Sequence, residues 1–446
     1  MSAPSGEKLP LLKDGPLALE GLARGLRTLD DMLVRCMRCG FCQAACPVYL
    51  ATMREADVAR GKLALVENLA FGLSRDPDAV NDRLHRCLLC GSCEKNCPSG
   101  VRITDVFILA RSLTASYLGL GPLKRLVFRQ ILPRPRLFET LARVARFFQR
   151  PFLRPAGGDP RTFSVPLLRP VLGERRVPRL AADPPPGEES LRIPRAARGL
   201  PRAAFFPGCV PDKIFPGIVR ASLKVLARHG AGFFIPRERV CCGLPLLSAG
   251  DREGFLRLVK RNLRAFREEK FDYLVTPCAS CASAVRVYWP RFSAYFAGED
   301  LKSLLFLAEN AYDATSFLTR VLKADFPPSP KDPALPRVVY HDPCHLRKSL
   351  GVFEEPRIIL KSLPGHLYRE APGAERCCGN GGSFNLAHYD LSFQIARRKR
   401  ADLISVSPRV AATTCPACML QLMDVFSREG DAVEVRHVIE LYADSM

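Results

Sequence analysis

The spacing of the cysteines constrains this chain more than any other feature of its sequence. The 446 residues contain 18 cysteines, and eight of them form two runs with one pattern, C-x2-C-x2-C-x3-C followed by proline. The runs are Cys36, Cys39, Cys42, Cys46 and Cys87, Cys90, Cys93, Cys97. Such regular thiol spacing predicts two metal sites in the first hundred residues.

This pattern is typical of bacterial ferredoxins, in which three closely spaced thiolates bind one iron–sulfur cube and the fourth cysteine binds the other. We therefore expect two [4Fe–4S] cubane clusters with crossed ligands. One set is Cys36, Cys39, Cys42 and Cys97, and the other is Cys87, Cys90, Cys93 and Cys46.

Structural zinc is the alternative for these eight thiols, because C-x2-C also suits a tetrahedral zinc ion. Zinc takes only four ligands and does not require a third cysteine at the same step with a trailing Cys-Pro. The duplicated pattern favours iron–sulfur clusters.

The other ten cysteines form a repeated set of five. Each set has a lone cysteine, a Cys-Cys-Gly and a C-x2-C, and the second set follows the first at offsets of 135 to 137 residues. The sets are Cys209, Cys241, Cys242, Cys278, Cys281 and Cys344, Cys377, Cys378, Cys415, Cys418. Repetition of the whole set argues against vicinal pairs that are merely buried or disulfide-linked.

Short apolar runs precede these cysteines and predict strands at 203–206, 273–276, 338–340 and 410–414. Between the first two, an apolar helical face runs from Ile218 to Leu226 and ends at Gly230. Alternating strands and helices predict parallel α/β sheets, whose ligands lie beyond the carboxyl ends of strands. The ten thiols are therefore expected to converge on two sites.

Composition excludes other classes of protein. Disulfide-rich secreted proteins are short and begin with a signal peptide, whereas residues 1–10 show no apolar region typical of one. No run of 18 apolar residues predicts a membrane span. We expect a cytoplasmic protein with reduced thiols.

The form C-x31-C-C-G-x34-C-x2-C resembles the cysteine-rich "CCG" domain of heterodisulfide reductase subunits and of glycolate and D-lactate oxidase iron–sulfur subunits. The resemblance implies one non-cubane [4Fe–4S] cluster in each set of five. Two ferredoxin motifs before two such units resemble the glycolate oxidase iron–sulfur subunit over nearly the whole chain, with support from 97–101, 129–138 and 435–440. Both units here are complete, which leaves D-lactate, a heterodisulfide-type partner or a glycerol-3-phosphate dehydrogenase relationship open.

The resemblance implies an electron-transfer subunit of a flavin-dependent 2-hydroxy-acid dehydrogenase. No G-x-G-x-x-G follows a predicted strand, so an FAD-containing partner is expected to oxidise glycolate or D-lactate, and no catalytic residue is expected here. Electrons would pass to a quinone-type acceptor. The alternative is thiol–disulfide chemistry at a CCG cluster.

The predicted fold class is α+β multidomain: a mainly helical bacterial-type ferredoxin module followed by two repeated α/β CCG domains. The predicted parts are an N-terminal extension (1–30), the ferredoxin module (31–115), a connector (116–202) and two CCG domains (203–325 and 326–446).

The connector is basic and rich in proline. Residues 121–202 hold 18 Lys and Arg against 6 Asp and Glu, and 14 of the 38 prolines. We expect a partly extended segment. Leu137, Phe138, Leu141, Val144 and Phe148 form one apolar helical face with Arg143, Arg146 and Arg150 elsewhere. That pattern suits a peripheral helix on the inner face of a membrane, or equally a helix packed on its own domain or a partner.

The net charge of +21 also suits nucleic-acid binding. Cluster charge offers another explanation, because Arg35, Arg38, Arg86 and Lys95 lie beside the ferredoxin cysteines. We therefore expect no nucleic acid. His341 and His345 flank Cys344 and are expected to tune that site by hydrogen bonds, whereas His437 is expected to pack.

Overall fold

The N-terminal module is helical. The computed structural model describes residues 19–149, 154–155, 161–164, 173–178, 199–329 and 332–446. The module consists of α1 (Leu19–Arg27), α2 (Asp30–Leu33), α3 (Phe41–Ala45), α4 (Pro47–Thr52), η1 (Glu55–Asp57), α5 (Ala59–Ala70), α6 (Pro77–His85), α7 (Ser92–Lys95) and α8 (Ile103–Leu118). Leu22 and Leu26 lie one turn apart on α1 and are fully buried in the core that α1 shares with α5 and α8. The helical module therefore includes residues that the sequence analysis assigned to an extension.

Two α/β units follow, and their sheets have the same topology. The first unit has the strand order β5-β4-β6-β7 and the second has β9-β8-β10-β11, with every neighbouring pair parallel. The internal cysteine repeat is thus a repeat of structure. It is the sheet expected when strands alternate with crossover helices.

The first unit consists of β4 (Arg202–Phe205), α12 (Cys209–Lys213), α13 (Pro216–Arg228), β5 (Gly232–Phe234), α14 (Leu244–Ser248), α15 (Arg252–Phe266), β6 (Tyr273–Thr276), α16 (Ala279–Ser283), η6 (Ala284–Tyr288), η7 (Pro290–Tyr295), α17 (Gly298–Asn310), β7 (Ala311–Asp313), α18 (Ala314–Ser316) and η8 (Phe317–Val321). The second consists of β8 (Arg337–Tyr340), η9 (His345–Ser349), α19 (Glu354–Lys361), β9 (Leu367–Arg369), α20 (Ser383–Ala387), α21 (Tyr389–Ile404), β10 (Val410–Thr413), α22 (Pro416–Glu429), β11 (Glu434–His437) and α23 (Val438–Asp444).

The four predicted strands are β4, β6, β8 and β10, with ends that differ by at most one residue from the prediction. They are almost wholly buried, which explains why they read as continuous apolar runs rather than as alternating ones. The predicted fold class, a helical ferredoxin-type module followed by two repeated α/β domains, is confirmed.

The described parts of the connector are α9 (Pro122–Leu126), η2 (Val127–Ile131), α10 (Pro135–Gln149) and a small antiparallel sheet of β1 (Arg154–Pro155), β2 (Thr162–Ser164) and β3 (Val177–Pro178). This sheet packs on α22 of the second unit, where Thr162 Oγ1 donates to Ser427 Oγ at 2.9 Å. On α10, Leu137, Leu141 and Val144 are exposed, whereas the side chains of Phe148 and Arg146 and all of Arg150 lie outside the described residues.

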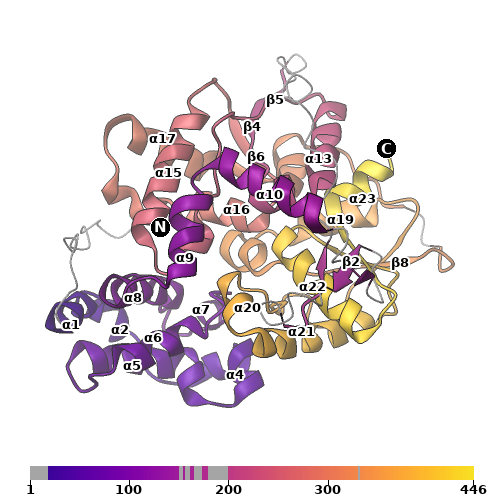
Figure 1. Ribbon diagram of the computed structural model, residues 1–446. Coiled ribbons are helices and arrows are strands. Elements are labelled where there is room, and N and C mark those ends of the chain that lie inside the picture. Colours follow the sequence, from indigo (N-terminus) through magenta and orange to yellow (C-terminus); the bar gives the residue numbers. More distant parts are fainter. Residues whose placement is uncertain (1–18, 150–153, 156–160, 165–172, 179–198, 330–331) are drawn as a thin grey trace.

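The helical module contacts both units. Arg111 on α8 donates to the carbonyl of Ser248 in the first unit at 2.6 Å, and Lys348 of the second unit donates to Ser92 Oγ at 2.5 Å. In Figure 1 the indigo module lies against the orange and yellow second unit, where α4 packs on α21. The two units join through α13 and α23.

Among the described helices, none alone has the length and apolar composition of a membrane span. Helix α8 together with the Pro122–Ile131 segment has both, with a bend of 107° between them.

Candidate metal centres

The structure gathers the eight ferredoxin-type cysteines around two separate cavities. Cys36, Cys39, Cys42 and Cys97 line the first cavity, which we call site A. Cys46, Cys87, Cys90 and Cys93 line the second, called site B. Each cavity therefore combines three thiols of one run with the last thiol of the other, the same two sets that the crossed pattern predicts.

The two loops that carry the closely spaced thiols have the same backbone shape. Arg38 and Gly40 adopt positive φ angles of 54° and 89°, and Leu89 and Gly91 adopt 51° and 71° at the equivalent positions. A positive φ is unfavourable for arginine or leucine, so the surrounding structure must hold it in place. These turns wrap each loop so that its three thiols face one cavity.

Cys46 reaches site B because it is the residue before Pro47, where α3 ends and α4 begins. Its Sγ accepts a hydrogen bond from the backbone N–H of Tyr49 at 3.4 Å, which caps α4. Burial raises the pKa of the Cys46 thiol to about 12, so a bound metal must displace its proton.

The five cysteines of the first unit form site C. They are Cys209, Cys241, Cys242, Cys278 and Cys281, and they follow strands β4 and β6 and the β5–α14 connection. Cys209 Sγ lies 3.8 Å from Cys241 Sγ, and hydrogen bonds from Cys241 and Cys281 lower the pKa of Cys242 to about 6. Gly208 is required here, because a Cβ at its position would lie 2.9 Å from Cys281 Sγ.

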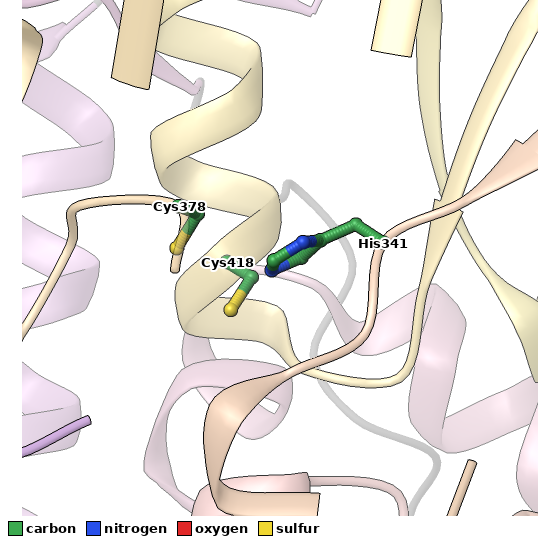
Figure 2. A group of neighbouring side chains, drawn as sticks. All are labelled: His341, Cys378 and Cys418. Atoms are coloured by element: carbon green, nitrogen blue, oxygen red, sulfur yellow. The ribbon is translucent and has the colours of Figure 1, made fainter. Parts of the chain in front are cut away.

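The five cysteines of the second unit form site D. They are Cys344, Cys377, Cys378, Cys415 and Cys418, placed by β8, the β9–α20 connection and β10. Cys378 and Cys418 are hydrogen-bonded neighbours, and Cys377 contacts Cys344. His341 lies beside Cys378 and Cys418 (Figure 2).

Sites B, D and C form a series in which B contacts D and D contacts C. Cys90 of site B is hydrogen-bonded to Cys377 of site D, and Cys415 of site D is hydrogen-bonded to Cys278 of site C. Ser280 Oγ lies 3.4 Å from Cys415 Sγ at the same junction. The carboxyl ends of β6 and β10 meet there, since Ala279 N–H donates to the carbonyl of Thr414 at 3.1 Å.

Three cations beside site B, the buried Lys62 and Arg111 and the half-buried Lys348, escaped sequence analysis. Lys62 is 2% exposed, Arg111 donates to the carbonyls of Leu84 and Cys87, and Lys348 bridges sites B and D through Ser92. Lys62 lies in α5 and Arg111 in α8, outside the cysteine runs, so their positions beside site B become clear only from the fold. Of the cations expected from the sequence, Arg38 pairs with Glu67, and Arg86 pairs with Asp57 and Asp82.

The donor sets fit iron–sulfur clusters. None of the 18 cysteines, all of which lie in the described residues, forms a disulfide. Sites A and B each offer the four thiols that a cube needs, and buried cations beside site B offset the negative charge of thiolate-bound iron. Sites C and D offer five thiols each, which exceeds the four ligands of structural zinc.

Comparison with known proteins agrees with this geometry. Residues 32–101 match the family described as 4Fe-4S dicluster domain, and residues 203–286 and 338–423 match the family described as Cysteine-rich domain.

Whole-length relatives are iron–sulfur proteins of redox complexes. The probable glycolate oxidase iron-sulfur subunit of Bacillus subtilis is 29% identical, with 92% of each chain covered. The glycolate oxidase iron-sulfur subunit of Escherichia coli is 26% identical, covering 95% of this chain and 96% of the relative. A subunit of the dihydromethanophenazine:CoB--CoM heterodisulfide reductase of Methanosarcina acetivorans is 27% identical, covering 92% and 93%. The expected resemblance is confirmed.

Proposed function

We propose that this chain, which joins a 4Fe-4S dicluster domain to two cysteine-rich domains, is the iron–sulfur electron-transfer subunit of a flavin-dependent 2-hydroxy-acid dehydrogenase. Its donor would be an FAD-containing partner that oxidises glycolate or D-lactate, and its acceptor a quinone. The observation that carries the proposal is the unbroken series of thiol sites, in which B contacts D and D contacts C. Similarity to two glycolate oxidase iron-sulfur subunits supports it.

We assign a cubane [4Fe–4S] cluster to each of sites A and B and a non-cubane [4Fe–4S] cluster to each of sites C and D. Such clusters accept and release one electron at a time. The protein's own part is to hold the thiols at fixed positions, exclude water and place positive charge beside them. Anaerobically purified protein should contain about sixteen iron atoms, four per cluster. A fully reconstituted protein that stops near eight, with zinc present, contradicts the assignment of C and D.

Electrons would enter at site A, because it is exposed and adjoins site B, with Ala59 and Ile103 lining both cavities. Cys39 is exposed, and the side chains of Val34, Met37 and Phe41 around it are 65–68% exposed. A cluster of exposed apolar side chains beside a redox site suits a protein partner. Arg35 and Arg38 on the same loop favour an acidic patch on that partner.

The test of this function is an assay of the isolated chain with and without its partner. We expect no oxidation of glycolate or D-lactate with an artificial dye by the chain alone, and activity once a flavoprotein subunit is added. Turnover by the chain alone, after absence of copurified flavin is established, contradicts the electron-relay proposal.

A second candidate function is thiol–disulfide chemistry at site C or D. It is favoured by similarity to the heterodisulfide reductase chain of Methanosarcina acetivorans. A fumarate reductase (CoM/CoB) chain of Methanothermobacter marburgensis, 27% identical over 95% of this chain, adds to that support. Disulfide reduction by the chemically reduced, isolated chain would favour this candidate. Its absence, together with electron acceptance from a flavoprotein, favours the first.

A further inference from the structure

Sites C and D differ at one position where the repeat would make them alike. The third residue before the lone cysteine is Phe206 in the first unit and His341 in the second. Both positions directly follow a central strand, β4 and β8 respectively, and both side chains are buried. The repeat thus places an apolar ring at site C and a ring with two nitrogen atoms at site D.

The imidazole of His341 points into site D. One of its ring nitrogens and the Sγ atoms of Cys378 and Cys418 all lie within 4.8 Å of one another. Figure 2 shows the ring extending from the segment after β8 toward Cys418 on α22 and Cys378 on its loop. Nitrogen and sulfur from three separate elements therefore face one small volume.

Within the described residues, neither ring nitrogen of His341 has a hydrogen-bond partner, although the side chain is 0% exposed. Buried polar atoms in folded proteins are almost always hydrogen-bonded. Two nearby histidines follow that rule: buried His437 Nε2 bonds to the carbonyl of Pro277 at 2.8 Å, and half-buried His345 Nδ1 bonds to Ser280 Oγ at 3.0 Å. The missing partner of His341 is then expected to be the group that the cysteines of site D hold.

We infer that His341 belongs to site D and contributes a ring nitrogen to the iron–sulfur group bound there, either as a ligand to iron or as an N–H donor to sulfur. Among the described residues, no histidine is grouped in this way with the cysteines of site C, where Phe206 takes the equivalent place. This inference rests on the proposed assignment of clusters to C and D. It makes the two centres chemically different despite their identical cysteine sets.

The nitrogen should also make the reduction potentials of the two sites differ. A neutral imidazole adds no negative charge, and an N–H donor stabilises the more negative, reduced state of a cluster. Lys348 adds positive charge between sites B and D, where its Nζ donates to Ser92 Oγ at 2.5 Å. We therefore expect the reduction potential at site D to lie above that at site C.

The deciding experiment is pulsed electron paramagnetic resonance of reduced protein in which only histidine carries 15N. The signal of site D is identified as the one that Cys418→Ser removes. We expect this signal to show a nitrogen coupling that changes from 14N to 15N when histidine is labelled. A large coupling corresponds to a nitrogen bound to iron and a small one to an N–H donor to sulfur, and each supports the inference. No histidine coupling in a protein with about sixteen iron atoms overturns it, while leaving the proposed function intact.

Substitutions provide a second readout. His341→Phe should abolish the histidine coupling and lower the potential of site D toward that of site C, and Phe206→His should create a coupling at site C. His229→Phe is the matched control. The ring of His229 is hydrogen-bonded to the hydroxyl of Tyr442 on α23, at a distance of 3.0 Å, and not to a cysteine of the four sites. If His341→Phe does not fold, the coupling measured in the labelled wild-type protein still tests the inference. A coupling that persists in folded His341→Phe contradicts the inference.

Discussion

At the scale of single residues, Lys62 shows how the fold prepares site B for a negative cofactor. Its Nζ donates to the carbonyls of Asp57 at 2.6 Å and Arg86 at 2.9 Å, and its side chain is buried. Burial lowers the pKa of Lys62, whereas the thiolates of Cys87 and Cys46 act in the opposite direction. A cation that is held here stabilises the reduced cluster.

Replacing Lys62 with methionine should lower the reduction potential at site B. We expect a fall on the order of 60 mV, which is about tenfold in a one-electron equilibrium. The measurement is a redox titration followed by electron paramagnetic resonance. Lys224→Met is the control, because Lys224 bonds to the carbonyl of Ala443 in the other part of the molecule. Equal potentials in wild-type protein and Lys62→Met would show that this charge does not act on site B.

The sequence predicts the cysteine sets well because ligand spacing is a local property. It places Cys46 and Cys97 in crossed sets from the run alone. It does not reveal Lys62 or Arg111, since a cation in a helix looks like any surface residue until the helix is packed. For His341 it indicates a place beside Cys344, but the unpartnered ring and the contact with Cys378 and Cys418 depend on three elements that are distant in the chain.

At the scale of elements, Gly250 is the point where the helical module docks on the first unit. It lies between α14 and α15 with a φ of 86°, and a Cβ there would come within 2.4 Å of the carbonyl oxygen of Arg111 on α8. Only glycine permits both this backbone conformation and this approach.

Gly250→Ala should therefore reduce stability more than a positive φ alone explains. Alanine at a positive φ costs about 1–2 kcal/mol, and forcing an atom into a packed contact adds about 1–3 kcal/mol. Gly430→Ala is the matched control, since Gly430 has a φ of 75° and an added Cβ there would meet nothing within 4 Å. Thermal unfolding of both variants under anaerobic conditions gives the comparison. Equal losses of stability in the two variants would mean that α8 moves to accommodate the added Cβ without an energetic cost.

The contact between α13 and α23 should depend on pH through His229. Its ring stacks on Tyr442 with 17° between the planes, and burial, followed by the charge of Arg228, lowers its pKa. A histidine whose folded pKa is depressed adds stability at pH values above its unfolded value of about 6.5, and that stability is lost as pH falls toward the folded pKa. We expect His229→Phe to lose less stability than wild-type protein between pH 7 and pH 5. Parallel unfolding curves for the two proteins would exclude this role.

The connector shows where prediction from sequence stops at this scale. The strands β6 and β10 follow from apolar runs, because burial on both faces leaves a local signal. The proline-rich segment predicts an extended chain, but β2 and β3 pack on α22 through Thr162 with Ser427 and through the N–H of Arg176, which donates to Asp424 at 2.7 Å. The partners in these two contacts are 265 and 248 residues apart, so no local sequence pattern predicts the contacts.

At the scale of the whole molecule, the two α/β units meet at the carboxyl ends of their strands, so that sites C and D face each other. The seam is held by His437 of β11, whose ring bonds to the carbonyl of Pro277 at 2.8 Å, and by Ala279 with Thr414. The helical module then sets the order of the sites. It presents Cys90 of site B to Cys377 of site D, and the first unit receives α8 on a face that carries Ser248 and Gly250.

This arrangement predicts that electrons reach site C through site D. Cys378→Ser should remove the centre at D. Site C should then stay oxidised for the time in which wild-type protein reduces it, because the hydrogen bond between Cys415 and Cys278 joins C to D. The mirror variant Cys242→Ser should remove the centre at C and leave the reduction of D unchanged. Rapid-freeze electron paramagnetic resonance after mixing with a reduced donor follows both centres. Reduction of C at the wild-type rate in a Cys378→Ser protein that retains about twelve iron atoms would mean that electrons bypass D, and the series B, D, C would have to be abandoned.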